Sequence, residues 1–158
     1  MTALHGIGGL PGAGKSTLAA RLAEAPATVR LSEDDLIAAL YPGEVATMGD
    51  WLDRAARVRN VVRPQVADML RAGVSVVLDF QANTVRSRRW MAGLAETAGA
   101  SLVLHWLDVP EAECLARLTA RNAAGAHPFA PTEAEFRQVA SHVVPPAPEE
   151  GLTVEWHR

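Results

Sequence analysis

One run near the amino terminus restricts the fold of this chain more than any other feature of its sequence. Residues 9–17 read Gly-Leu-Pro-Gly-Ala-Gly-Lys-Ser-Thr and satisfy the pattern G-x-x-x-x-G-K-[ST] of a phosphate-binding loop. Such a loop joins a strand to a helix, and its glycines let backbone N–H groups point toward one anion at the positive end of that helix. The flanking segments fit, because residues 4–8 are a short apolar run and residues 16–24 carry leucine and alanine at helical spacing.

The motif predicts particular contacts with a nucleotide. Lys15 is the only lysine among fifteen basic residues, which indicates a position that needs a compact point charge rather than a guanidinium. We expect Lys15 to reach the β- and γ-phosphates of ATP and the Ser16 hydroxyl to ligate Mg²⁺. A bare turn between strand and helix is the alternative, but it would need neither side chain. The residues of the motif predicted to bind the nucleotide are Gly9, Pro11, Gly12, Ala13, Gly14, Lys15, Ser16 and Thr17.

Composition limits the class of protein. The chain has 158 residues, of which 49% are hydrophobic and 21% charged, so it can bury one core, and we expect a single domain over residues 1–158. No apolar run approaches the roughly 20 residues of a membrane span, and the amino terminus has no signal-peptide layout, which predicts a cytoplasmic location without membrane contact. The single cysteine permits no internal disulfide. The formal net charge of −3 argues against nucleic acid as the main partner. The sequence does not specify the oligomeric state.

Apolar runs alternate with amphipathic segments along the whole chain. The expected strands are 4–8, 27–32, 74–79, 101–107 and 152–156, and the expected helices are 16–24, 33–40, 51–72, 86–98, 111–122 and one that Thr132 caps. We expect Asp50 to cap the long helix and Pro64 to kink or divide it. This alternation predicts a mostly parallel five-stranded sheet with right-handed crossovers, in a three-layer α/β/α sandwich.

Acidic residues stand where the predicted strands end. Ligands of an open parallel sheet bind beyond the carboxyl ends of its strands. Asp79 follows four hydrophobic residues and is a candidate to hold Mg²⁺ beside Ser16, unless it only caps the strand. Asp34, at the tip of the second strand, is a candidate base for a substrate hydroxyl, with Asp35 as the second choice. A solvated acidic pair that favours the helix dipole is the alternative for both.

Arginines and polar loop residues complete the predicted site. Arg117 and Arg121 lie one turn apart before a loop at 123–131, so they could close over the nucleotide and neutralise charge on the transferred phosphoryl group, as parts of a short lid at about 117–131. Ordinary surface arginines are the alternative. Three arginines open the helix after Asp79 against its dipole, which indicates an anionic partner or only an exposed face. The residues predicted to contact the substrate are Asp34, Asp35, Gln81, Asn83 and Arg86.

Other residue types predict structural roles. The histidines show no metal-ligand spacing, and the tryptophans are more typical of a core than of a stacking platform. These residues are His5, His105, His127, His142, His157, Trp51, Trp90, Trp106 and Trp156.

The chain resembles the small P-loop kinases that include polynucleotide kinase, chloramphenicol phosphotransferase, gluconate kinase and zeta toxin. The resemblance rests on residues 9–17, on Leu-Ser-Glu-Asp-Asp at 31–35, on Val-Val-Leu-Asp at 76–79 and on Arg117 with Arg121-Asn122. It implies a nucleoside-kinase-like P-loop fold with strand order 2-3-1-4-5 and ATP-dependent transfer of phosphate to a hydroxyl. It also implies Asp34 as the base and Arg121 as the lid arginine.

One position departs from the polynucleotide kinases, which carry an arginine three residues after the base. Ile37 occupies that position here, although residues 79–83 and Arg86 resemble the polynucleotide-kinase stretch Asp-x-Asn-x-Asn and its later arginine. We therefore expect an ATP- and Mg²⁺-dependent kinase that phosphorylates a hydroxyl of a small metabolite or antibiotic. The alternatives are a polynucleotide 5′-hydroxyl kinase and a nucleotide-gated ATPase switch without a hydroxyl acceptor.

Overall fold

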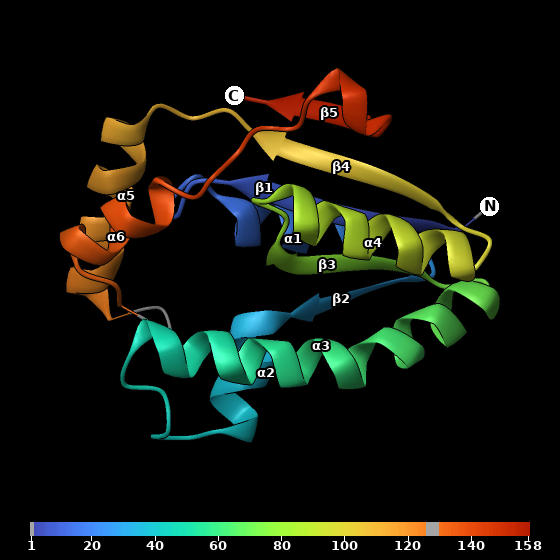
Figure 1. Cartoon of the computed structure of the whole chain (residues 1–158), viewed down its shortest axis with the longest axis horizontal. Helices are drawn as coiled ribbons and strands as arrows, with labels where there is room; N and C mark the ends of the chain where they lie inside the picture. Colours follow the sequence, from blue (N-terminus) through green and yellow to red (C-terminus); the bar gives the residue numbers. More distant parts are fainter. Residues whose placement is uncertain (1, 126–129) are drawn as a thin grey trace.

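The computed structural model describes residues 2–125 and 130–158. Strands and helices alternate along the chain from the amino terminus (Figure 1). The strands are β1 (Ala3–Gly9), β2 (Thr28–Ser32), β3 (Ser75–Gln81), β4 (Ser101–Leu107) and β5 (Thr153–His157). The helices are α1 (Lys15–Leu22), α2 (Glu33–Leu40), α3 (Met48–Arg71), α4 (Val85–Thr97), α5 (Glu111–Ala124) and α6 (Glu133–Ala140), with a 3₁₀ turn η1 at Pro148–Glu150.

The five strands form one sheet in the order β2-β3-β1-β4-β5, and every pairing is parallel. The predicted strand order and sandwich architecture are thus confirmed. The central strands β1, β3 and β4 are largely buried, as expected of continuous apolar runs that carry helices on both faces.

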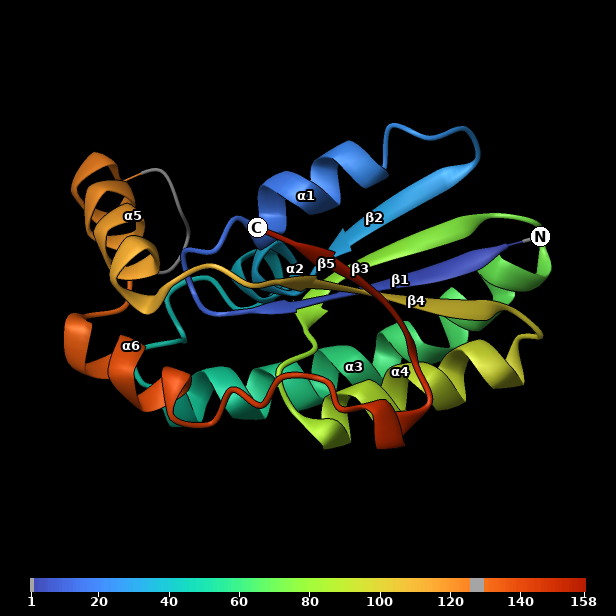
Figure 2. The ribbon, with the colours of Figure 1, turned by 90° about the horizontal axis from the view of Figure 1, so that it is seen from above.

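Helices cover the two faces of the sheet unequally. Seen from above, α3 and α4 lie on one face and α1 lies on the other (Figure 2). On the α3 side, Val66 and Leu70 join Leu78 in the larger core cluster. On the α1 side, Leu18 packs with Ile7 in a second cluster that also includes Phe136 of α6. Burial of these apolar stripes fixes the helices against the sheet. The polar residues that follow each strand are thereby held at the end of the sheet.

The structure corrects the expected cap of α3 and shows that Pro64 does not divide the helix. Its N-cap is Thr47, whose side chain accepts a hydrogen bond from the Asp50 amide. The Asp50 carboxylate in turn accepts from the Thr47 amide at 3.1 Å, so Asp50 is the reciprocal partner in a capping box rather than the cap itself. Pro64 lies inside the helix and does not divide it, because the buried stripe formed by Val58, Val62 and Val66 continues past it.

Strand β3 continues two residues beyond Asp79. The pairing of β3 with β1 shifts between Gly6 and Ile7, because Gly6 pairs with Leu78 and Ile7 pairs with Gln81, so the two additional residues at this irregularity, Asp79 and Phe80, belong to β3. Asp79 sits within the strand, opposite Ser32 of β2. Beyond the irregularity the Ala82 amide donates to the Ile7 carbonyl at 3.1 Å.

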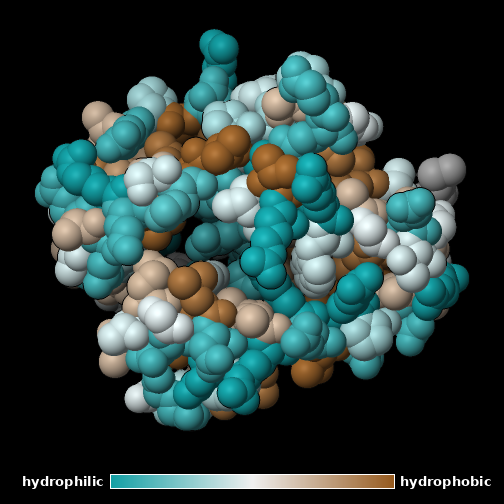
Figure 3. All heavy atoms as spheres, viewed as in Figure 1, coloured by the Kyte–Doolittle hydropathy of each residue, from teal (hydrophilic) through white to brown (hydrophobic). Residues whose placement is uncertain are grey.

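None of the helices in the two described segments combines the length and the apolar character that a membrane crossing needs. The space-filling view shows a hollow lined by hydrophilic side chains, between the region of α5 and α6 and the region of α3 (Figure 3). In the ribbon, this hollow lies at the carboxyl-terminal end of the central strands (Figures 1 and 3). Ligands of an open parallel sheet bind at this end of its strands.

Candidate active site

The phosphate loop between β1 and α1 is fixed by close backbone contacts. Gly12 has φ +82°, and a Cβ there would lie 2.3 Å from the backbone oxygen of Cys114 in α5, so the loop passes the start of α5 too closely for any side chain. The Gly9 amide donates at 2.8 Å to Oδ1 of Asn83, which lies beyond β3. Both contacts hold the loop in a defined shape before any ligand arrives.

Helix α1, like α5, begins without a side-chain cap, but α5 has Glu111 and Glu113 in its first turn. The N-cap of α1 is Gly14, at φ +100°, which has no side chain to accept from the first amides, and the first turn of α1 contains no acidic residue. Ser32, Thr47, Thr84 and Thr132 provide side-chain caps for α2, α3, α4 and α6. The first amides of α1 therefore remain to bind an anion, as expected of a phosphate-binding helix.

Lys15 lies over the loop from which it projects. Its Nζ donates to the carbonyls of Gly9 at 2.7 Å and Leu10 at 2.8 Å, which uses two of its three donors. Burial lowers the pKa of Lys15 to about 8, and the negative charges of Asp79 and Asp34 oppose that shift. The ammonium group is thus poorly solvated and placed where two predicted site acids act on it.

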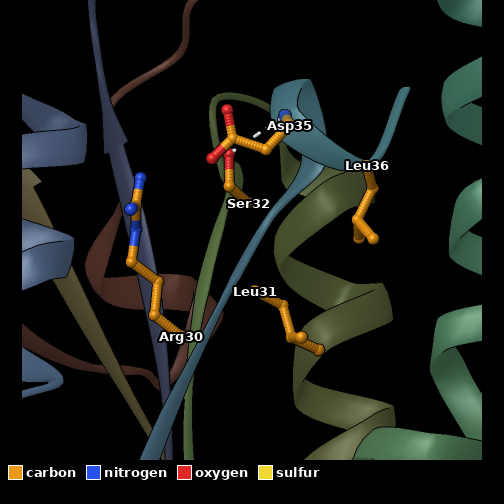
Figure 4. A pocket seen from close by; sticks show the side chains of 5 residues that line it. All are labelled: Arg30, Leu31, Ser32, Asp35 and Leu36. Carbon is orange, nitrogen blue, oxygen red and sulfur yellow. Dashed lines mark hydrogen bonds between the residues drawn. The ribbon is translucent and has the colours of Figure 1, made fainter. Parts of the chain in front are cut away.

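Asp34 and Asp35 follow β2 in the first turn of α2 but face different surroundings. Asp34 is half-buried, and its Oδ1 accepts a hydrogen bond of 3.1 Å from Nε1 of Trp51 in α3. Asp35 is exposed and lines a pocket of about 300 Å³ at the end of β2. In that pocket the Arg30, Ser32 and Asp35 side chains point to one side of the chain, while Leu31 and Leu36 point to the other (Figure 4).

Asp79 makes an ion pair that the sequence did not predict. Its Oδ2 lies 2.6 Å from Nη2 of Arg30 in β2, and its side chain is only 9% exposed. The pair forms because Ser32 and Asp79 are in register, which places Arg30 two residues back on the neighbouring strand. Ser16 is exposed at the start of α1.

A second buried acid stands beside Asp34. Glu33 is 1% exposed, and both its oxygens accept from Arg59 of α3, at 2.8 and 3.3 Å. Burial raises the pKa of Glu33, and the Arg59 hydrogen bond opposes that shift. This bidentate pair fixes α2 against α3, and so it holds the turn that carries Asp34.

The two predicted lid arginines behave differently. Arg117 is exposed, pairs with Glu113, and donates to the phosphate-loop carbonyl of Ala13 at 3.4 Å. Arg121 is half-buried, and its Nε has no hydrogen-bond partner among the described residues. Burial lowers the pKa of Arg121, and the charge of Asp34 opposes that shift, which places the guanidinium within electrostatic reach of the candidate base. Part of the predicted lid, with His127, lies outside the described residues.

A second pocket, of about 450 Å³, opens at the start of α5. It is lined by Asp108, Val109, Pro110, Glu113, Arg117 and Arg158. Because Arg117 also contacts the phosphate loop, this pocket adjoins the loop on its α5 side.

The remaining predicted substrate residues divide into two groups. Asn83 is 5% exposed and bonds the phosphate loop, although its Nδ2 has no partner within the described segments. Gln81 is half-buried at the end of β3, and Arg86 is exposed at the start of α4. Arg88, in the first turns of α4, is fully buried and forms an ion pair of 2.7 Å with Glu150. One of the three arginines that open α4 therefore has its anionic partner within the protein.

Sequence reasoning missed three residues that touch the predicted site. Trp51 packs against the core, as expected, and in addition bonds Asp34, while Arg30 and Arg59 stand in no motif. The one available signal is the charged Arg30 between Val29 and Leu31, in a strand next to a segment that ends in an aspartate. The pairing of Trp51 with Asp34 depends on how α3 packs, which no local pattern encodes.

The sheet order and the phosphate loop together define an α/β P-loop NTPase fold. The sequence profile of the AAA domain (AAA_33) matches residues 4–146, and the chain belongs to that family. The resemblance to small P-loop kinases is thereby confirmed. No functionally curated protein matches the sequence significantly.

Solved structures share this fold at low sequence identity. A candidate kinase from Chloroflexus aurantiacus superposes with a TM-score of 0.76 and 23% identity, over 98% of this chain and 84% of that one. A chain of the Pnkp1/Rnl/Hen1 RNA repair complex gives a TM-score of 0.70 and 22% identity, over 89% of this chain and 43% of that one. The Mycobacterium tuberculosis APS kinase CysC, solved with AMPPNP and APS, gives 0.55 and 19%, over 89% and 96%.

Proposed function

We propose that this protein is an ATP-dependent kinase that transfers the γ-phosphate to a hydroxyl group of a small molecule. The observation that carries the proposal is the uncapped start of α1 behind a rigid glycine loop, with the ammonium group of Lys15 folded over it. The turn from β4 to α5 also lacks a side-chain cap, but α1 combines its uncapped start with a first turn free of acidic residues and with a lysine whose pKa burial lowers.

The proposed roles follow from the positions of the side chains. Lys15 and the loop residues Gly9 to Thr17 bind the phosphates, and Asp34 accepts the proton of the attacking hydroxyl. Arg121 and Arg117 neutralise charge on the phosphoryl group while it is transferred. Arg121 is the better placed of the two, because its half-buried Nε has no partner within the described residues and Asp34 acts on its charge.

The residues at the loop fit a magnesium ion. Mg²⁺ takes oxygen ligands, keeps several waters and needs only one or two protein groups besides the phosphates. The Ser16 hydroxyl is exposed at the start of α1, and Asp79 supplies a carboxylate whose Oδ2 contacts Arg30. In the proposal Ser16 holds the ion and Asp79 does so directly or through water, while the bound ion would screen the phosphate charges.

The acceptor is proposed to enter the hydrophilic hollow beside α3 (Figure 3), and Asp35, Gln81, Asn83 and Arg86 are the residues proposed to contact it. A small molecule fits the net charge of −3 better than a long polyanion does. A polynucleotide 5′-hydroxyl is the second candidate, because one similar structure belongs to an RNA repair complex. The segment at about 117–131 is proposed as a lid of one kinase domain over residues 1–158.

An acceptor screen with labelled ATP tests the proposal. The purified protein with Mg²⁺ and γ-labelled ATP is incubated with hydroxylated metabolites, antibiotics, nucleosides and 5′-hydroxyl oligonucleotides, and both ADP and labelled product are measured. We expect label on a small molecule and ADP release that this acceptor accelerates. Label on oligonucleotide ends, with binding that weakens steeply as salt rises, would favour the second candidate. ADP release that no acceptor accelerates would contradict both candidates and favour a nucleotide-gated switch.

A further inference from the structure

Three histidines that are distant in the sequence form a connected row across one face of the sheet. Nδ1 of His5 in β1 lies 3.0 Å from Nε2 of His105 in β4, and Nδ1 of His105 lies 3.0 Å from Nε2 of His157 in β5. Glu155 of β5 adds a carboxylate oxygen 3.4 Å from the same Nδ1 of His105. The row therefore converges on one point, between His105, His157 and Glu155.

Parallel strand pairing produces this convergence. His105 is in register with Ile7 of β1 and with Glu155 of β5, so alternate residues of the three strands project on one face. Helix α1 packs over the β2 side of that face (Figure 2). His105 is 1% exposed, whereas the Glu155 side chain is 59% exposed. The cluster is therefore buried at His105 and open to solvent at Glu155.

The three converging atoms suit a tetrahedral metal ion. They lie within 4.8 Å of one another. With metal–nitrogen and metal–oxygen bonds of about 2.0–2.2 Å, neighbouring ligand atoms of a tetrahedron stand roughly 3.3–3.6 Å apart. Two of the observed separations are close to that spacing, 3.0 Å between the two nitrogens and 3.4 Å from Nδ1 of His105 to the carboxylate oxygen, and the third pair lies within 4.8 Å.

The hydrogen bond to His5 also suits metal binding by His105. When Nδ1 of His105 is a ligand, its Nε2 carries the proton and donates to Nδ1 of His5. A ligating histidine characteristically donates its other ring N–H in this way, which fixes its tautomer and orientation.

We propose that His105, His157 and Glu155 form a binding site for a divalent transition metal of the zinc class, with His5 as the residue that orients His105. Two imidazoles and one carboxylate with a fourth position for water make a ligand set suited to Zn²⁺. The ion would join β5, an edge strand, to β4. The site is independent of the proposed kinase residues, none of which contributes a ligand.

Metal titration of the untagged, EDTA-dialysed full chain, without nucleotide, tests the proposal. Zn²⁺ is titrated by calorimetry, Co²⁺ is followed by visible ligand-field absorption, and zinc X-ray absorption reports the ligands. We expect one Zn²⁺ per chain, a tetrahedral Co²⁺ spectrum that Zn²⁺ abolishes, and nitrogen and oxygen ligands at about 2.0–2.2 Å. Absence of binding, or a coordination shell without imidazole, would overturn the proposal.

Single variants separate the ligands from a purely structural hydrogen-bonded row. His157→Ala and Glu155→Ala change residues at the accessible side of the cluster, and circular dichroism in EDTA checks that both fold. Each should abolish the Co²⁺ spectrum. His5→Ala should weaken Zn²⁺ binding by about 10- to 100-fold and preserve the stoichiometry, as removal of an orienting partner does. His142→Ala, at an exposed histidine outside the row, is the matched control and should bind as the unmodified protein does. Binding that persists at full strength in His157→Ala would refute the site.

Discussion

Trp51 donates a hydrogen bond of 3.1 Å from its indole nitrogen to Oδ1 of Asp34. The contact joins the first turn of α3 to the first turn of α2, and it gives Asp34 a fixed direction beside Lys15, on whose charge it acts. Asp35, the next residue, is exposed in a separate pocket. The two carboxylates, which the sequence left as alternatives, therefore have different environments, and Asp34 is the better candidate base.

Asp34→Asn should leave ATP binding unchanged and lower phosphotransfer to the best acceptor by about 10²- to 10⁴-fold, the usual contribution of a general base. The amide keeps the shape and can still accept from Trp51, but it cannot take a proton. ATP affinity is measured by calorimetry and transfer by labelled product. Asp35→Asn is the matched control and should transfer at nearly the unmodified rate. The opposite pattern would assign the base to Asp35.

Trp51→Phe should lower kcat by roughly tenfold, because the aromatic ring stays while the hydrogen bond that directs a charged carboxylate is lost. KM for ATP should not change. Trp51 is a positioning residue, so its effect should vanish when Asp34 is already asparagine, which a double-mutant cycle measures. Trp156→Phe, at a tryptophan that is 54% exposed on β5, is the control. An equal loss of kcat in both backgrounds would mean that Trp51 acts only on packing.

ATP affinity should fall as pH rises above about 8, the value to which burial lowers the pKa of Lys15. Only the protonated amine attracts phosphate, so above that pH binding has to take up a proton, and Kd should rise by up to tenfold for each pH unit. Calorimetry in buffers of different ionisation enthalpy measures the proton uptake. Lys15→Met should bind ATP weakly at every pH and show no such slope. A constant Kd between pH 7 and pH 10 in the unmodified protein would contradict this role.

The fold was predictable because its determinants are local. Apolar runs such as Val76 to Leu78 identify buried strands, and the Gly-x-x-x-x-Gly-Lys-Ser pattern identifies the turn that joins β1 to α1. The predicted cap of α3, Asp50, lies three residues after the observed cap, Thr47. Both residue types are good caps, and only the backbone geometry distinguishes the cap from its reciprocal partner. Local pattern was sufficient for the elements and insufficient for their exact ends.

The contacts that shape the site depend on register and packing, which one sequence does not reveal. Arg30 meets Asp79 because β2 and β3 pair in one register, and a shift by one residue would separate them. The histidine row arises in the same way, since residues 5, 105 and 157 have no motif spacing and become neighbours only through strand order. The sequence therefore predicted the phosphate loop and Asn83 and Arg117, which contact it, but not the contacts made by Arg30, Arg59 and Trp51.

Glu150→Gln should destabilise the folded protein by about 3 kcal/mol or more near pH 7, because it removes the charge partner of a fully buried arginine. Both oxygens of Glu150 bind Arg88, at 2.7 and 2.8 Å, and the remaining Arg88 donor contacts the carbonyls of Ala82 and Val144. The hydrogen bonds from Arg88 lower the pKa of Glu150. The contribution of Glu150 to the free energy of unfolding is therefore complete above the ordinary glutamate pKa and is lost as pH falls through the lowered value. Urea unfolding at neutral and acidic pH should show the difference between Glu150→Gln and the unmodified protein shrinking as acid is added. Glu149→Gln, at the exposed neighbour, should be neutral, and equal losses in the two variants would contradict the role of this ion pair.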